Sequence, residues 1–175
     1  GILIFKVKSL INNMTVLDRR YVRLVRDCDI NKLEEYFNIQ STENMKKNFS
    51  LEKIDSKNYR LKVKYFYYPK YPERFFIEEL PYEINNKIIS YLHTYINISF
   101  VISHPNEYPF DNPIWHLEDI SHNLYKLNLK NYYQNIVNEI NKVYTKQWVC
   151  GIQLDKYILD LIIRINNFDI FHKKL

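Results

Sequence analysis

Residues 96–103 carry an apolar side chain at every second position. These are Ile96, Ile98, Phe100 and Ile102, and the polar residues Asn97, Ser99 and Ser103 lie on the other side of the alternation. A period of two places successive side chains on opposite faces of a strand, which is typical of a strand with one buried face. The pattern therefore predicts a strand at residues 96–103.

Three prolines, Pro105, Pro109 and Pro113, follow this strand within nine residues. Each proline fixes its own φ and pushes the preceding residue towards an extended conformation, so the ladder must end here. Tyr108 and Phe110 lie between the prolines. Large aromatic side chains exposed to solvent would bury no apolar surface. We therefore expect a rigid loop that folds back and is held by both of them. We call residues 104–113 the YPF loop.

Further strands are expected on both sides of this stretch. Phe49 and Leu51 alternate with polar residues, and the alternation resumes after the polar turn at residues 55–58, with Tyr59 as its first apolar position. This pattern is typical of a β-hairpin with a four-residue loop. A short apolar run at residues 114–117 predicts a fourth strand. Together the segments predict a four-stranded antiparallel meander.

The remaining periodic segments have helical spacing. Residues 15–37 carry an apolar stripe with a break near residues 27–29, and the stripe consists of Leu17, Tyr21, Leu24, Val25, Leu33, Tyr36 and Phe37. Residues 80–93 predict an inserted helix, with Pro81 in its first turn. Two C-terminal stripes follow. They consist of Tyr133, Ile136, Val137, Ile140, Val143 and Tyr144, and of Leu154, Ile158, Leu161, Ile162 and Ile165.

The order of these elements predicts an α+β fold. It comprises an N-terminal helix, a four-stranded antiparallel meander sheet, the YPF loop, an inserted helix and two C-terminal helices. We expect one domain at residues 15–175, with the helical insertion at 80–93 and an apolar N-terminal arm at 1–14. The length of 175 residues suits a single domain.

Composition narrows the class of protein. Hydrophobic residues make up 46% and charged residues 26% of the chain, which is typical of a globular protein. With only two glycines there is no Gly-rich phosphate loop, so a Rossmann or P-loop nucleotide enzyme is not expected. The abundance of Asn, Ile, Lys and Tyr points to an A- and T-rich coding genome, as in some protists and large DNA viruses.

Charge, hydropathy and cysteine usage indicate a compartment. The net charge of +5 fits a mildly basic surface better than a nucleic-acid-binding one. No run approaches about 18 apolar residues, so no membrane span is expected. Cys28 and Cys150 lie far apart without metal-type spacing, which favours two free thiols in a reducing compartment. We expect a cytoplasmic or nuclear protein, or one in the host cytoplasm if the source is viral.

The densest positive patch lies on the first predicted helix and consists of Arg19, Arg20, Arg23 and Arg26. A solvated helix face explains these arginines without any further role. The alternative is a docking face for an acidic partner. On that hypothesis, charge reversal at Arg20 and Arg23 should weaken the binding of an acidic partner and leave the thermal stability of the protein nearly unchanged.

No other chemistry is indicated by residue spacing. His104, His116 and His122 lack the spacing of a zinc site, so neither a metal nor another cofactor is expected. Glu118 and Asp119 fit an exposed turn. Most tyrosines fall on the predicted buried stripes, which explains them as core residues rather than as a base-stacking platform.

The strand order and the YPF loop together resemble a known family. Tyr108-Pro109-Phe110-Asp111-Asn112-Pro113 is similar to the YPF-x-x-P segment of the ubiquitin-conjugating enzymes, which RWD domains and catalytically inactive variants share. Trp148, followed by an apolar helix, resembles the tryptophan before the penultimate helix of that family. The resemblance covers residues 15–166 apart from the insertion. It implies a domain that docks partners through its first helix, its sheet or the loop after the YPF turn.

The resemblance does not extend to the catalytic residues. Active members carry His-Pro-Asn after the last strand and then a cysteine upstream of the tryptophan. Here that position is Ser121-His122-Asn123, and no cysteine lies between it and Trp148. His104-Pro105-Asn106 precedes the YPF loop, where the family has no catalytic role for it. Cys150 follows Trp148 and is expected to be a small buried residue.

We therefore expect a non-catalytic ubiquitin-conjugating-like domain that binds protein partners, with components of the ubiquitin pathway as the partners implied by resemblance. The expected docking residues are Arg19, Arg20, Arg23, Arg26, Tyr108, Pro109, Phe110 and Pro113. One alternative is a structural or assembly protein of a large DNA virus that reuses the fold. Another is an active conjugating enzyme that uses Cys150. A third is an adaptor, because residues 80–92 resemble the opening helix of an F-box.

Overall fold

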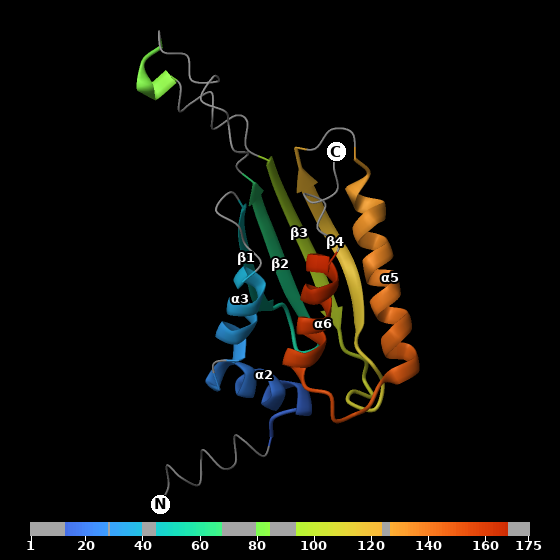
Figure 1. The fold of residues 1–175 in the computed structure, drawn as a ribbon. Coiled ribbons are helices and arrows are strands. Elements are labelled where there is room, and N and C mark those ends of the chain that lie inside the picture. The colour runs from blue at the N-terminus through green and yellow to red at the C-terminus, as the bar shows by residue number, and fades with distance from the viewer. Residues whose placement is uncertain are drawn as a thin grey trace, which may run out of the picture.

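Four strands form a single antiparallel sheet in the computed structural model, which describes residues 13–27, 29–39, 45–67, 80–84, 94–123 and 127–167 (Figure 1). The strands are β1 (Met45–Lys53), β2 (Asn58–Tyr67), β3 (Thr94–Ser103) and β4 (Ile114–His122). Each strand pairs with the next in the order β1-β2-β3-β4. The predicted meander is confirmed, and so is the α+β class.

Helices of the described chain pack on one face of this sheet (Figure 1). They are α2 (Val16–Arg26), α3 (Asp29–Ile39), α5 (Leu129–Gln147) and α6 (Leu154–Asn167). α3 packs against β1 and α6, α5 packs against β4 and α6, and α2 lies across the lower end against α3 and α6. The N-terminal helix is thus two helices, which separate at the predicted break. None of the described helices is long and apolar enough to cross a membrane.

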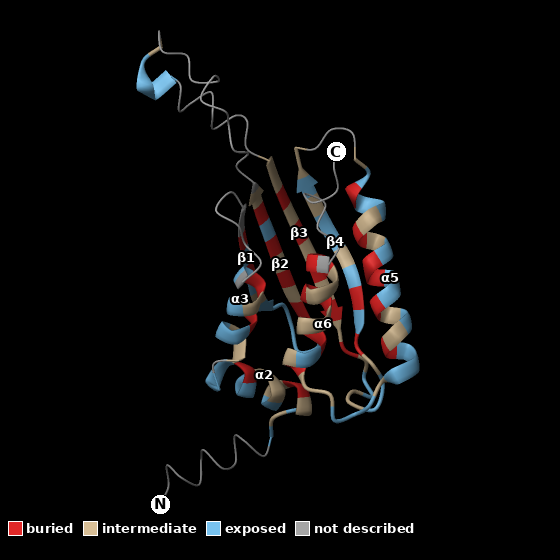
Figure 2. Cartoon of the chain, viewed as in Figure 1, coloured by how far each residue is buried: buried red, intermediate tan, exposed pale blue. Residues whose placement is uncertain are grey.

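The alternation of the strand sequences builds the core. In β3 every second residue from Ile96 to Ile102 is buried, and the residues of β2 that face them are buried as well. Figure 2 shows these buried positions as bands across the strands. Full burial of one such aliphatic side chain contributes about 1.5–3 kcal/mol relative to its exposure. The stripes of α5 and α6 complete the core from the other layer.

The fourth strand is longer than the sequence indicated. β4 continues to His122, whereas the pattern predicted its end at Leu117 and a turn at Glu118 and Asp119. The cause is a β-bulge, because Leu117 faces Phe100 while Asp119 faces Ser99, which leaves Glu118 as the extra residue. The bulge shifts the next inward residue from position 119 to position 120 and breaks the period of two.

The first helix and the predicted insertion differ from the expectations from sequence. Val25 was assigned to the buried stripe of the first helix, yet it is 49% exposed, because Leu17 and Leu24 already define the buried side of α2. Of the predicted insertion, the structure describes residues 80–84, which include a helical turn at 82–84. Residues 85–93, the arm at 1–12 and Cys28 lie outside the described residues.

Candidate protein-docking surface

The YPF loop folds back on itself, as predicted. The Tyr108–Pro109 peptide bond is cis. The amide of Tyr108 donates to the carbonyl of Pro105 at 3.1 Å, and the amide of Phe110 donates to the carbonyl of Glu107 at 2.7 Å. These bonds satisfy backbone groups inside the loop, so its shape does not depend on a bound ligand.

Aromatic contacts hold the loop from behind. The ring of Tyr108 lies edge-on to His104 at 4.8 Å between centroids, and at 6.2 Å from Trp148. The indole N–H of Trp148 donates to the carbonyl of Pro109 at 2.8 Å. Phe110 takes no part in this packing and is 76% exposed. The prediction that both aromatic side chains pin the loop is therefore wrong for Phe110, because Tyr108 and Trp148 already fill the space behind the loop.

Arg20 ties three segments together. Its guanidinium donates to the Tyr108 hydroxyl at 2.6 Å and to the carbonyl of Ile152 at 2.8 Å, and it also donates to the carbonyl of Cys150. It lies 5.2 Å from the centroid of the Tyr108 ring, within the range of a cation–π contact. Arg20 therefore joins α2 to the YPF loop and to the α5–α6 connection. Charge reversal at Arg20 is now expected to lower stability, contrary to the sequence-based expectation.

His104 is buried and both of its ring nitrogens are engaged. Nδ1 lies 2.7 Å from the carbonyl oxygen of Lys57, so Nδ1 carries the proton, because a carbonyl can only accept. Nε2 then accepts from the Tyr157 hydroxyl at 2.7 Å. Burial lowers the pKa of His104 to about 4, against a partial opposing effect of the bond to Lys57. His104 thus has no nitrogen free for a metal or for base catalysis.

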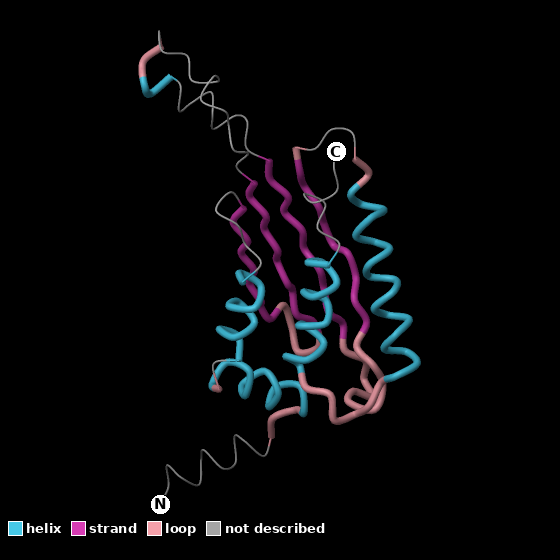
Figure 3. Tube along the Cα trace, viewed as in Figure 1, coloured by secondary structure: helices cyan, strands magenta, loops and turns pink. Residues whose placement is uncertain are grey.

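Around these buried contacts lie side chains that point into solvent. On α2, Val22 is 44% exposed and lies among arginines on the outer helix face. In the loops, Phe110 and Val149 are 76% and 61% exposed. Figure 3 shows that the β3–β4 and α5–α6 connections lie at the same end of the sheet as α2. We call this set the docking end, and it consists of Arg19, Val22, Arg23, Val25, Arg26, Phe110 and Val149.

The docking end carries an excess of positive charge. The carboxylate of Asp27 forms ion pairs with Nε of Arg23 at 3.5 Å and with Nε of Arg26 at 2.9 Å. Arg19 is exposed as well. Arg23 and Arg26 therefore share one carboxylate on this face, and Arg19 adds a further exposed guanidinium group. Exposed ion pairs of this kind contribute little to stability, so these arginines are available to a partner at little cost to the fold.

The structure sorts the predicted docking residues into two groups. Arg19, Arg23, Arg26 and Phe110 are exposed at one end of the molecule, whereas the other four serve the fold. Those four are Arg20, Tyr108, Pro109 and Pro113. Sequence reasoning missed Val22 and Val149. The position of Val22 between Arg19 and Arg23 on the polar helix face was the available signal for an exposed apolar residue.

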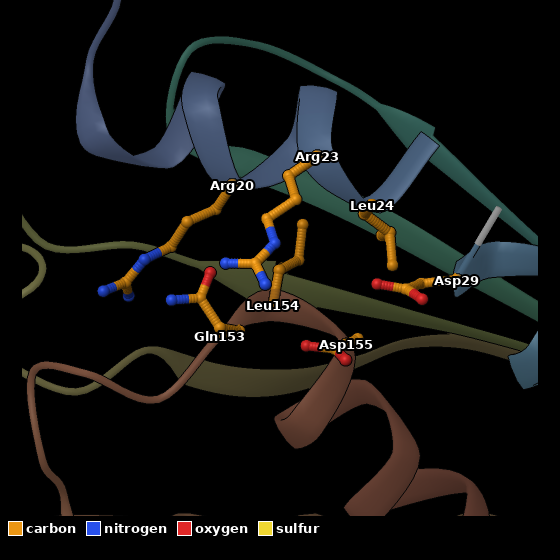
Figure 4. A pocket seen from close by; sticks show the side chains of 7 residues that line it. All are labelled: Arg20, Arg23, Leu24, Asp29, Gln153, Leu154 and Asp155. Carbon is orange, nitrogen blue, oxygen red and sulfur yellow. The ribbon is translucent and has the colours of Figure 1, made fainter. Parts of the chain in front are cut away.

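A small pocket of about 40 Å³ lies between α2 and the starts of α3 and α6 (Figure 4). Arg23 extends from α2 towards the start of α6, and Asp29 and Asp155 complete the polar wall (Figure 4). This volume holds a water molecule or two and no larger ligand. Within the described residues, no group of three His, Cys, Asp or Glu side chains is placed to hold a metal ion.

Residues 121–123, at which the sequence resemblance looks for a catalytic tripeptide, lie at the end of β4. Ser121 and His122 end β4, and the side-chain oxygen of Asn123 accepts from the amide of Tyr95 at 3.0 Å. Only residues 123–128, Asn-Leu-Tyr-Lys-Leu-Asn, connect β4 to α5, and none of them is a cysteine. Cys150 lies beyond α5 as an exposed free thiol, so the expectation that it is buried is wrong.

Comparison with known proteins found no matching family model, no matching curated protein and no matching solved structure. The functional argument therefore rests on the residues and geometry of this chain.

Proposed function

We propose that the protein is a non-catalytic, ubiquitin-conjugating-like or RWD-like domain that binds protein partners. The observation that carries the proposal is the YPF loop. Arg20 and Trp148 hold it from behind, while Phe110 projects from its outer side. A large apolar side chain on a fixed backbone, next to guanidinium groups, is typical of an interaction hot spot, since little entropy is lost when it is covered.

The chemistry of the docking end indicates the partner. Arg23 and Arg26 share the carboxylate of Asp27, and Arg19 is exposed on the same helix. The exposed Val22 and Val25 lie among these arginines. A protein surface with carboxylates around an apolar patch would complement both features. Components of the ubiquitin pathway are the candidates that the resemblance implies.

The main alternative is an active conjugating enzyme that uses Cys150. Its exposure favours this reading, because an accessible thiol is a requirement for thioester formation. Its place after α5 argues against it, since the family's cysteine precedes the tryptophan that corresponds to Trp148. No described side chain is seen to activate the thiol by a hydrogen bond.

A thioester assay separates the two readings. With ubiquitin, its activating enzyme and ATP, we expect no adduct that a thiol reductant removes, because residues 123–128 provide no nucleophile. A known active conjugating enzyme in the same reaction serves as the positive control. A reducible adduct that disappears in Cys150→Ala would replace the proposal with the enzymatic reading.

Substitutions at the docking end test the binding function. Arg19→Glu combined with Arg23→Glu, and separately Phe110→Ala, should change the free energy of unfolding by less than about 0.5 kcal/mol each, because these side chains are exposed. Each variant should lose the partners that crosslinking of the wild-type chain identifies. Lys142→Glu, on the exposed side of α5, is the matched control and should keep them. An identical set of partners for all variants would refute the docking end.

A further inference from the structure

A second pocket lies beside the YPF loop, between the start of α2 and the β1–β2 turn. Its volume is about 160 Å³. Val16, Leu17, Pro105 and the ring of Tyr108 supply its apolar surface, and Lys57 and Asn106 lie at its rim. Tyr108 also holds the YPF loop to α2, because its hydroxyl accepts from Arg20. The pocket is therefore continuous with the structure that holds the YPF loop.

The size of the pocket limits what it can hold. Cavities of about 150 Å³ accept a benzene-sized group. Sites for small-molecule substrates are usually about 300–1,000 Å³. A volume of about 160 Å³ thus suits one leucine or phenylalanine side chain. It is too small for a typical metabolite together with its reacting partner.

Hydrogen bonds fix the walls in advance. The carboxylate of Asp55 accepts from the amides of Lys57 and Asn58 at 2.8 and 2.9 Å, which shapes the β1–β2 turn. The carbonyl of Lys57 accepts from the backbone amide of His104 at 3.0 Å and from its ring. Lys57 also donates through its ammonium group to the side chain of Asn106. A pocket whose walls are already ordered loses little entropy when an apolar group enters.

The rim of the pocket is positive. Among the described residues that line it, Lys57 is the charged one and none is a carboxylate, while Asp55 lies in the same turn as Lys57. His104 is neutral because its ring is buried between two hydrogen-bond partners. The neighbouring Asp18 is compensated by Lys53 at 2.9 Å. A segment that places carboxylates on either side of an apolar residue would therefore match both the rim and the interior.

We propose that this pocket anchors one apolar side chain of an acidic segment of a protein partner. The inference rests on the proposed binding function and adds a specific anchor to it. The occupant is a leucine or phenylalanine with acidic neighbours, and the arginines of α2 receive the more distant part of the same partner. Anchors of this kind carry a large share of the binding energy of an interface.

Blocked pentapeptides provide the probe. The peptides have the sequence Asp-Glu-X-Glu-Asp, with X as leucine, phenylalanine or alanine, and they are titrated into the ¹⁵N-labelled full chain. We expect saturable shifts at the amides of Leu17, Lys57 and Asn106, with the alanine peptide weaker by about tenfold or more, because alanine lacks three carbons of leucine and six of phenylalanine. Val16→Phe should fill the pocket and abolish the preference for leucine. Val101→Phe makes the same change on the partly exposed side of β3, away from the pocket and the docking end, and should keep it.

The outcomes distinguish the two proposals. Equal affinity for all three peptides, with shifts at Arg19 and Arg23, would overturn the anchor and leave the docking end intact. No shifts at millimolar peptide would overturn the anchor, while the crosslinking comparison decides the docking end separately. A third outcome concerns the peptide-free protein. If Phe5→Ala shifts the amide signals of Thr15 and Leu17, residues 1–12 of the chain itself occupy the pocket, and the proposal is overturned.

Discussion

Replacement of Arg20 by methionine is expected to lower the free energy of unfolding by about 2–4 kcal/mol. The substitution keeps the apolar stem and removes the donors to the Tyr108 hydroxyl and to the carbonyls of Cys150 and Ile152. A buried acceptor left without its donor costs about 1–3 kcal/mol, and water can reach only some of these half-buried groups. Urea unfolding followed by tryptophan fluorescence measures the loss, with Trp148 close to the affected site.

Arg23→Met is the matched control for Arg20→Met. The side chain of Arg23 is 59% exposed and meets Asp27 at 3.5 Å, so its loss should cost less than about 0.5 kcal/mol. Tyr108→Phe removes one of the three contacts of Arg20, and a double-mutant cycle with Arg20→Met isolates that bond. Equal stabilities of Arg20→Met and Arg23→Met would mean that Arg20 does not join the three segments.

Periodicity predicted most of the fold because most of the chain alternates regularly. The β-hairpin, β3, α5 and α6 each have one buried face, so their apolar residues recur with the period of the strand or helix. Prediction failed at β4, where the extra residue Glu118 moves the inward position from 119 to 120. A bulge is a property of strand pairing, which no local pattern contains. The same limit applies to Val25, because the buried width of a helix depends on its neighbours.

The candidate site was predictable in its composition and not in its contacts. Sequence spacing identified the arginines of α2 and the YPF loop, and the structure places both at one end of the molecule. The sequence did not show that Arg20 serves the fold while the neighbouring arginines are exposed. That difference depends on carbonyl groups 130 and 132 residues further along the chain.

One buried histidine, His104, holds together the segments behind the YPF loop. His104 contacts the β1–β2 turn through Lys57, α6 through Tyr157, and the YPF loop through the Tyr108 ring. These are three separate elements of the fold, and two of them also form the wall of the anchor pocket. Protonation of His104 would place a charged ring in this buried site, so these contacts favour the neutral ring.

Acidification should therefore destabilise the fold in a window that His104 sets. Burial lowers its pKa from 6.5 to about 4, so between these values the unfolded chain binds a proton that the folded chain does not. Stability from this group is complete above pH 6.5 and is lost as pH falls towards 4, at up to about 1.4 kcal/mol per pH unit, or about 2 kcal/mol by pH 5. Carboxylates with lowered pKa values, such as Asp18 and Glu118, lose their stabilising effect as pH falls through their ordinary pKa values of 3.8 and 4.5 and below, which lies under the pH 5 end of the measurement. Urea unfolding at pH 7, 6 and 5 measures the slope, and His104→Phe should be less stable at pH 7 but flatter across the range. Parallel curves for the two proteins would assign the acid sensitivity to other groups.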